Sequence, residues 1–364
     1  MAIEAPVAAA PATAPDPDKL NAFIGKALGD IGAAASAALV IIGDKCGLYR
    51  ELGNGTPLTS QQLAERTKTH ERYVREWLAN QAASGYVEYD PATQTYRLPP
   101  EQAFMLADET SPLYVHGVFQ IIQAMIVDEP QITERFRSGG GFGWHEHDER
   151  LFEGTERFFR PGYNAHLVGE WIPALGGVEE KLERGAKVAD VGCGLGASTI
   201  IMAKAYPKST FVGFDYHQKS IDLARERAKA AGVADRVSFQ VARAQDFPGK
   251  DYDLVALFDC LHDMGDPASA AKHIRSALAK DGTWMLVEPF ANDKLEENLN
   301  PIGRIFYAAS TMLCTPSSLA QEVGLALGAQ AGEARLRNVA ADGGFTHFRR
   351  ATETPFNLVF EAKP

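Results

Sequence analysis

The first hundred residues show apolar positions at helical spacing and then a short alternating pattern. Thr59 and Gln62 have the spacing of a capping box, and Gly85 is placed to end a helix. Two short β patterns flank the turn residues 90–93. The three helices are expected to begin near residues 20, 59 and 70, and the two strands to span residues 86–89 and 95–98. This order predicts a winged helix.

The rest of the chain changes from helices to alternating strands and helices. Residues 112–175 have a helical pattern that a glycine-rich loop at 138–143 interrupts. After residue 181, apolar strand patterns alternate with helical ones, which predicts a parallel sheet with helices on both faces. Two closing strands, near 344–349 and 356–362, have no helix between them and predict an antiparallel edge hairpin.

Composition and charge narrow the class of protein. The 364 residues are 45% hydrophobic and 23% charged, which is typical of globular chains, and this length favours two domains. The net charge of -11 disfavours general nucleic-acid binding. The four cysteines show no paired CxxC spacing, so we expect reduced thiols, a cytoplasmic protein and no metal site.

The N-terminal segment shows neither a secretory signal nor a membrane span. Residues 1–18 are rich in proline and have no basic residue before their apolar letters, so we expect a disordered tail. The longest apolar run, residues 31–42, is shorter than the roughly 18 residues that a span needs. It predicts a buried helix and no membrane association.

A glycine-rich turn carries the strongest chemical signal. The strand that contains Asp190 leads directly into Gly192, Gly194 and Gly196, after which a helix begins. Glycines allow a ligand to approach the backbone closely, and the helix N-terminus offers free N–H groups. Asp215 ends the next strand, 19 residues beyond Gly196, where a carboxylate can bind the two hydroxyls of a ribose. The pattern predicts a nucleotide-like cofactor.

Two cofactor classes fit this turn. Gly192, Gly194 and Ala197 also satisfy the dinucleotide fingerprint, so an NAD-dependent oxidoreductase is one alternative. A dinucleotide needs two mononucleotide-binding halves, and only one half is visible here before the edge hairpin. The surroundings of the turn therefore favour a cofactor with a single nucleoside.

The ordered motifs resemble those of class I S-adenosylmethionine-dependent methyltransferases. The resemblance rests on the turn at 190–196, on Asp215, on the stretch 257–267 around His262, and on the stretch 285–289 that contains Glu288. With a winged helix ahead of this fold, the chain is similar to two-domain small-molecule O-methyltransferases, in particular to a bacterial branch with mycobacterial members. The resemblance covers residues 19–364.

The resemblance implies the cofactor, S-adenosylmethionine, and a set of binding residues. The residues expected at the cofactor are Asp190, Gly192, Gly194, Gly196, Asp215, Tyr216, Ala244, Gln245 and Phe258. Family members often have an acid after the third strand that binds the adenine amino group. This chain has Arg243 at that point, so Gln245 or Asp246 is expected to substitute.

His262 is the candidate general base. It lies just past the fourth strand of the predicted sheet, and an imidazole with an ordinary pKa near 6.5 suits removal of a proton from a phenol or acidic hydroxyl. Glu288 ends the fifth strand and is expected to orient it. The same letters also occur in methyltransferases in which the histidine only packs or lines the cofactor site, so both roles stay open.

The substrate is expected to be a small, partly apolar molecule. Trp144, Tyr163, Phe306 and Tyr307 are the candidate substrate residues, the last two in a predicted helix at 301–313. The segment 144–149 contains two histidines and three acids but no third spaced ligand set, so it predicts a solvated lid and no metal site.

A transcriptional regulator that senses a metabolite is the competing class. Cations and acids nearly balance in residues 19–100, and Glu71 and Glu76 alternate with Arg72 and Arg75 on the third helix. Such a helix neutralises phosphates poorly, so DNA binding is disfavoured. The apolar first helix fits a homodimer better. The predicted domains are a tail at 1–18, a winged helix for dimerisation at 19–110, a helical linker and lid at 111–178, and the catalytic domain at 179–364.

Overall fold

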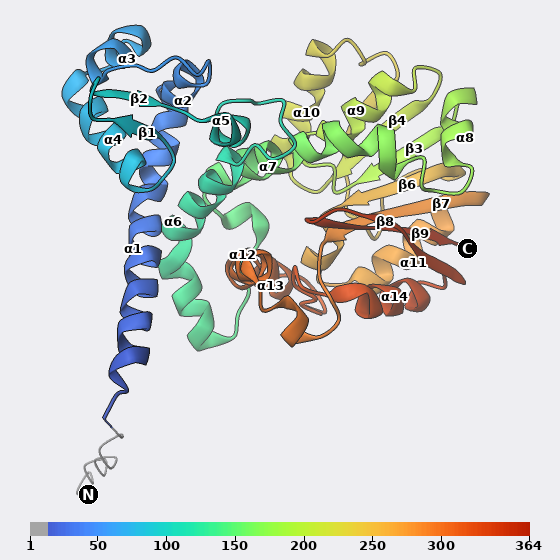
Figure 1. Ribbon diagram of the computed structural model, residues 1–364. Coiled ribbons are helices and arrows are strands. Elements are labelled where there is room, and N and C mark those ends of the chain that lie inside the picture. The colour runs from blue at the N-terminus through green and yellow to red at the C-terminus, as the bar shows by residue number, and fades with distance from the viewer. Residues whose placement is uncertain (1–13) are drawn as a thin grey trace, which may run out of the picture. The chain divides into compact units, whose positions relative to one another are not determined.

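The structure is a computed structural model that describes residues 14–364 (Figure 1). Most of the predicted tail, residues 1–13, lies outside the described residues. Pro17 and Asp18, which we expected in the tail, instead form the first turn of a helix whose N-cap is Asp16. The chain divides into two compact units, residues up to 102 and residues 103–364.

The first unit is a winged helix, as predicted. Thr59 and Gln62 form the expected capping box at the start of the helix α3, Ser60–Thr67. Leu58 adds an isolated bridge to Tyr96 beside the antiparallel wing. Its elements are α1 (Pro17–Lys45), α2 (Leu48–Leu52), α3 (Ser60–Thr67), α4 (Glu71–Ala83), β1 (Glu88–Asp90) and β2 (Thr95–Arg97).

The first helix, α1, is longer and less buried than the sequence pattern predicted. Within the run 31–42, Val40 and Ile41 are buried, whereas Ile31 is 65% exposed and Ile42 is 47% exposed. In residues 14–364, α1 alone has the length and composition of a membrane-crossing helix, and 22% of its apolar window is buried. The core helix of a soluble protein passes the same test, so this finding alone assigns no membrane role.

The second unit contains a seven-stranded sheet with the order β5-β4-β3-β6-β7-β9-β8. The strands are β3 (Lys187–Val191), β4 (Thr210–Asp215), β5 (Val237–Val241), β6 (Tyr252–Phe258), β7 (Leu278–Pro289), β8 (His347–Glu353) and β9 (Asn357–Lys363). β3 to β7 run parallel, and β9 lies antiparallel between β7 and β8. The predicted α/β fold with an antiparallel edge hairpin is confirmed.

Helices cover both faces of this sheet (Figure 1). On one face, Val188 and Leu254 pack with Met202 of α9 and Ile221 of α10. On the other face, Val255 packs against α11 and α14. Alternate residues of one strand thus point into two cores, as a sheet buried on both faces requires. These helices are α8 (Val178–Arg184), α9 (Ala197–Ala205), α10 (Gln218–Ala230), α11 (Pro267–Ala277) and α14 (Gly332–Asp342).

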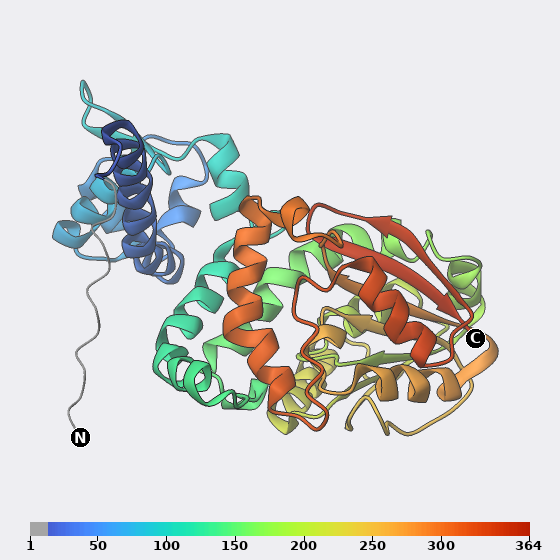
Figure 2. The ribbon, with the colours of Figure 1, turned by 90° about the horizontal axis from the view of Figure 1, so that it is seen from below.

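Further helices lie before, between and after the strands, and Figure 2 shows α12 alongside α6. Residues 301–319 form one helical stretch with a π turn in its middle, longer than the predicted helix at 301–313. The elements are α5 (Pro100–Leu106), α6 (His116–Ser138), η1 (Trp144–Glu146), α7 (Arg150–His166), η2 (Leu167–Trp171), η3 (Leu261–Asp263), η4 (Leu295–Asn298), α12 (Pro301–Ala309), η5 (Ser310–Cys314) and α13 (Thr315–Leu319).

Candidate functional site

A cavity of about 430 Å³ opens at the carboxyl ends of β3, β4 and β6, within the second unit. The turn after β3, the ends of β4 and β6, and the loop after β5 line one side. η1, α7 and α13 contribute residues to the other side. The carboxyl edge of such a sheet is where ligands of α/β proteins bind. Most of the predicted site residues therefore meet at one place.

The glycine turn needs its glycines for two different reasons. Gly192 has φ +77°, and a Cβ there would lie 2.5 Å from Sγ of Cys260. Gly194 has φ +50° and open space where a Cβ would project, and it lines the cavity. Gly196 is the N-cap of α9 and does not line the cavity. Gly196 therefore serves packing, since a Cβ would lie 2.7 Å from Phe239.

The two predicted cofactor acids have different surroundings. Asp190 is buried beneath the turn and accepts hydrogen bonds from the hydroxyls of Ser198 and Thr199, both at 2.6 Å. Burial raises its pKa to about 6, and it does not line the cavity. Asp215 lines the cavity and accepts from the N–H groups of Gly194, at 3.0 Å, and His217, at 2.9 Å. A carboxylate has about four acceptor positions, so Asp215 retains capacity for a ribose diol.

The loop after β5 places the two predicted adenine contacts differently. Ala244 and Gln245 line the cavity. Asp246 is not among the lining residues, and its carboxylate pairs with Arg243, Nη2 to Oδ2 at 2.5 Å. The pairing lowers the pKa of Asp246. Gln245 is therefore the better placed of the two.

Aromatic side chains form much of the remaining wall. Trp144, Tyr163, Tyr216 and Phe258 all line the cavity, as do Phe152 and Phe159, which the sequence analysis did not single out. The ring of Tyr163 lies 5.2 Å from that of Phe258. The wall gives an apolar ligand large surfaces to pack against.

The substrate prediction for Phe306 and Tyr307 needs correction. Phe306 is 6% exposed and packs in a core with Leu151 and Leu313. Neither Phe306 nor Tyr307 lines the cavity. The cavity is lined instead by Ser317, in α13, and by Ala320 and Gln321, which follow that helix. The small side chains of the first two give no signal of binding in the sequence.

Asp259 is a site residue that the sequence analysis missed. It follows β6 directly, lines the cavity and accepts hydrogen bonds from the Tyr163 hydroxyl, at 3.0 Å, and the Asn357 amide, at 2.9 Å. Burial raises its pKa well above the ordinary value. Its place at the end of a parallel strand, next to the pocket-forming Phe258, was the available signal.

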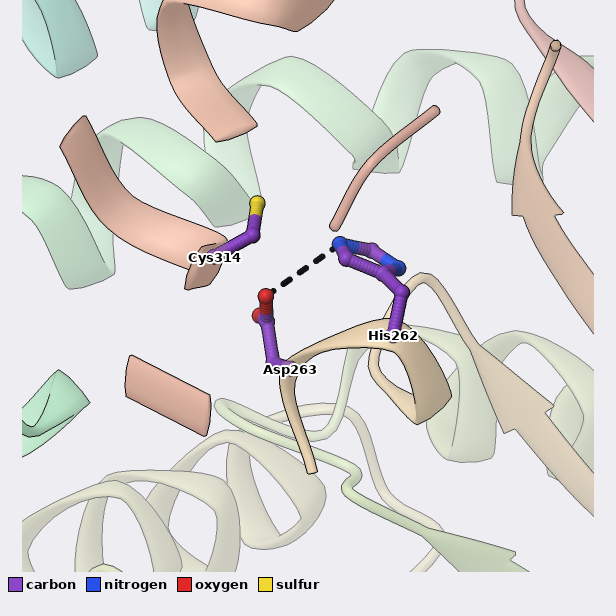
Figure 3. Close-up of side chains that lie close together, drawn as sticks. All are labelled: His262, Asp263 and Cys314. Atoms are coloured by element: carbon purple, nitrogen blue, oxygen red, sulfur yellow. Dashed lines mark ion pairs between the residues drawn. The ribbon is translucent and has the colours of Figure 1, made fainter. Parts of the chain in front are cut away.

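His262 and Glu288 lie together, but beside the cavity and not on its wall. His262 is 3% exposed, and its Nδ1 lies 2.5 Å from Oε2 of Glu288. Nε2 of His262 lies 3.3 Å from Oδ1 of Asp263 (Figure 3). Burial lowers the pKa of His262, but Asp263 and Glu288 more than offset this, so its pKa is well above the ordinary value. Asp263 lines the cavity, whereas His262 does not.

The histidines of the segment 144–149 are not both solvated, which corrects the prediction of a solvated lid. His145 lines the cavity, with its ring 6.0 Å from that of Tyr216. His147 is buried, and Nδ1 lies 2.8 Å from Oδ2 of Asp128. Burial lowers the pKa of His147.

Two family matches cover most of the chain. Residues 182–339 match the family described as "Methyltransferase domain", and residues 34–108 match the "Rv2258c-like winged HTH domain". The first match contains the glycine turn, Asp215, His262 and Glu288, so it confirms the resemblance drawn from these motifs.

Curated relatives match over shorter stretches. Norajmaline N-methyltransferase of Rauvolfia serpentina is 28% identical over 163 residues, which are 40% of this chain and 54% of that protein. The 27-O-demethylrifamycin SV methyltransferase of Amycolatopsis mediterranei is 37% identical over 87 residues, 23% of this chain and 32% of that protein. The matched stretches thus span at most about half of the length of these relatives.

Solved structures share the fold along nearly the whole chain. A putative O-methyltransferase of Nostoc punctiforme has a TM-score of 0.69 at 20% identity, over 96% of this chain and 100% of that one. The mitomycin 7-O-methyltransferase has a TM-score of 0.67 at 19% identity, over 95% and 100%. The chain therefore consists of a methyltransferase domain with the class I fold and an N-terminal winged helix-turn-helix domain.

Proposed function

We propose that this chain is an S-adenosylmethionine-dependent methyltransferase that acts on an oxygen of a small, partly apolar metabolite. One observation carries the proposal: a single cavity brings together Gly194, the carboxylate of Asp215 and the amide of Gln245. These groups suit, in this order, the methionine, ribose and adenine parts of the cofactor. The structural neighbours include human N-acetylserotonin methyltransferase in complex with SAM, which has the same fold.

The transfer itself makes modest chemical demands. The acceptor oxygen forms a bond to the methyl carbon as the bond between that carbon and the sulfonium sulfur breaks, and the acceptor loses its proton. The sulfonium supplies the electrophile, so the protein has to align the acceptor with the sulfur and the methyl group. The aromatic wall formed by Trp144, Tyr163 and Phe258 supports an acceptor with an apolar body. Oxygen as the acceptor atom follows the O-methyltransferases among the structural neighbours.

The role of His262 as the general base stays a prediction. The ring nitrogens of His262 face Glu288 and Asp263, and these two acids hold the pKa of the imidazole above its ordinary value. A general base must reach the proton that it removes, and His262 does not line the cavity. Glu288 and His262 therefore fit better as positioning residues for Asp263, which faces the cavity.

The alternatives receive less support. For a DNA-binding regulator, α4 should present free cations, but Arg72 pairs with Glu76 at 2.5 Å and Arg75 with Glu71 at 2.7 Å. For an NAD-dependent enzyme, the sheet offers one nucleotide-binding half followed by the hairpin β8–β9. We also propose a homodimer built on α1 and a cytoplasmic location, the latter because the four cysteines are all unpaired.

Calorimetry tests the proposed cofactor. Titration of the full chain with S-adenosylmethionine and with its demethylated product should show binding of both. Asp215→Ala should weaken binding by ~1.5–3 kcal/mol, the range for a hydrogen bond to a charged group. Asp222→Ala is the matched control, since Asp222 lies on α10 with its carboxylate 3.0 Å from Arg225 and outside the cavity lining. Tight NADH binding without binding of the sulfonium cofactor would contradict the proposal.

A further inference from the structure

Three ligand-type side chains converge at the edge of the cavity (Figure 3). A ring nitrogen of His262, a carboxylate oxygen of Asp263 and the sulfur of Cys314 all lie within 4.8 Å of one another. His262 and Asp263 come from η3, and Cys314 ends the π turn η5. His262 and Cys314 are buried, and Asp263 lines the cavity. The cluster thus joins two separate parts of the chain beside the proposed methyl-transfer site.

The polar atoms of this neighbourhood are incompletely satisfied. Oδ1 of Asp263 receives no well-aligned hydrogen bond, although Nε2 of His262 lies 3.3 Å away, and Nε2 of the buried His147 has no hydrogen-bond partner. Both histidines have Nδ1 against a carboxylate, Glu288 for His262 and Asp128 for His147. A histidine that binds a metal commonly has its second ring nitrogen bonded to a carboxylate in this way. This arrangement fixes the ring of His262 with Nε2 toward Asp263.

We propose that His262, Asp263 and Cys314 bind a divalent transition-metal cation of the zinc class at the edge of the cavity. Imidazole nitrogen, carboxylate oxygen and thiolate sulfur are the three ligand types that zinc takes in proteins. Bond lengths of about 2.0–2.3 Å place tetrahedral ligands roughly 3.3–3.8 Å apart. Ligand atoms within 4.8 Å of one another need only a small contraction to reach this geometry.

The charges in this part of the protein favour a cation. Glu288, Asp259 and Asp263 are three acids near the one imidazole of His262. Uncompensated negative charge is costly away from water. A dication bound to the Cys314 thiolate and the Asp263 carboxylate is electrically neutral with its ligands. The thiol proton, and the Nε2 proton of His262 where the ring is protonated, leave to solvent as the metal binds.

The role of the metal rests on the proposed function. A three-ligand site keeps a coordination position open, and the Asp263 carboxylate places this site at the cavity wall. A hydroxyl acceptor bound there loses its proton more readily, because the cation stabilises the oxyanion. The cation would thus activate the acceptor, with His262 as its ligand and not as a general base.

Cobalt titration tests the site without any activity measurement. Full-length protein, freed of tag and treated with chelator, is titrated with Co²⁺ and followed by its absorption spectrum. We expect uptake of one ion per chain with a thiolate-to-cobalt charge-transfer band that Zn²⁺ abolishes. Cys314→Ser should remove the band, whereas Cys46→Ser, a thiol in the winged helix, should retain it. Absence of stoichiometric uptake, or a band unchanged in Cys314→Ser, overturns the proposal.

A second variant keeps the test decisive if Cys314→Ser does not fold. Asp263→Asn retains the thiol and should keep the band with at least tenfold weaker affinity for Co²⁺, since a carboxylate ligand is replaced by a neutral amide. Affinity equal to that of the unmodified protein overturns the assignment of Asp263. The same samples are titrated with S-adenosylhomocysteine. Protein that binds this compound but takes up no cobalt overturns the metal site alone and leaves the proposed function standing.

Discussion

The carboxylate of Glu288, in β7, lies 2.5 Å from the Nδ1 atom of His262, in η3. The second oxygen of the same carboxylate accepts a hydrogen bond from the Leu261 N–H at 2.9 Å. One acid thus holds both the backbone and the ring of the short helix that carries Asp263 to the cavity. This link connects the core of the sheet to the wall of the site.

In chelator-treated, metal-free protein, the raised pKa of His262 predicts a pH-dependent stability. The protonated ring stabilises the folded state fully below its unfolded pKa of about 6.5, and this stabilisation is lost as the pH rises toward the higher folded pKa. Between these values, the free energy of unfolding should fall by up to about 1.4 kcal/mol per pH unit. His262→Gln should remove this slope in denaturant titrations at several pH values. Parallel curves for the two proteins would contradict the assignment.

The contact between the glycine turn and Cys260 predicts an energetic coupling. Gly192→Ala should destabilise the protein by about 2–4 kcal/mol, because its φ of +77° strains an L residue and its Cβ would lie 2.5 Å from the Cys260 sulfur. Cys260→Ala removes that sulfur. A double-mutant cycle in chemical denaturation should therefore show a coupling energy above ~1 kcal/mol. Additive effects would show that backbone strain alone sets the cost.

Gly194 offers a matched comparison within the same turn. It also has a positive φ, but no atom lies within 4 Å of the position that a Cβ would take, and the residue lines the cavity. Gly194→Ala should therefore cost only the ~1–2 kcal/mol of an unfavourable backbone conformation, and it should lower cofactor affinity at least tenfold. Calorimetry and denaturation on the same variant separate the two effects. Unchanged cofactor affinity would exclude Gly194 from the binding surface.

The sequence predicted the fold well, because its signals are local and repeated. The strands that precede Gly192 and end at Asp215 are short apolar runs, and the order of strands and helices fixes which ends share an edge of the sheet. Residues at those ends therefore met in one cavity, as expected for Asp215, Gln245 and Phe258.

The remaining parts of the site depend on tertiary packing that periodicity does not encode. Phe306 turned out to be core because the rotation of its helix about its own axis is set by contacts with Leu151 and Leu313. Cys314 and His262 are 52 positions apart in the sequence. They lie near each other only because the helical stretch 301–319 returns to the site. The carboxylate that holds His147 is that of Asp128, 19 positions earlier in the chain, in α6.

The adenine end of the cavity gives a paired test of two adjacent residues. Gln245→Ala should weaken binding of S-adenosylhomocysteine by about 1 kcal/mol, the usual worth of one hydrogen bond between neutral groups. Asp246→Ala should have a smaller effect on the affinity, because the Asp246 carboxylate does not line the cavity and pairs instead with Arg243. Calorimetry at one pH and salt concentration compares the two. The reverse order of effects would show that Asp246 turns inward to replace the family's usual acid.

The exposed face of α1 predicts the oligomeric state. Leu20, Phe23, Ile24, Leu28 and Ile31 are all at least 45% exposed, and their spacing places them along one side of the helix. A second copy of the same helix can cover such a stripe by symmetry. Light scattering should therefore give the mass of a dimer for the full chain and that of a monomer for the double variant Phe23→Asp, Leu28→Asp.

Lys26→Glu is the matched control for this double variant. It breaks the pair with Asp30 on the same helix but leaves the apolar stripe intact, so the dimer should persist. A dimer that survives the double variant would place the interface elsewhere. A full chain that requires detergent to stay in solution would favour insertion of α1 into a membrane over dimerisation.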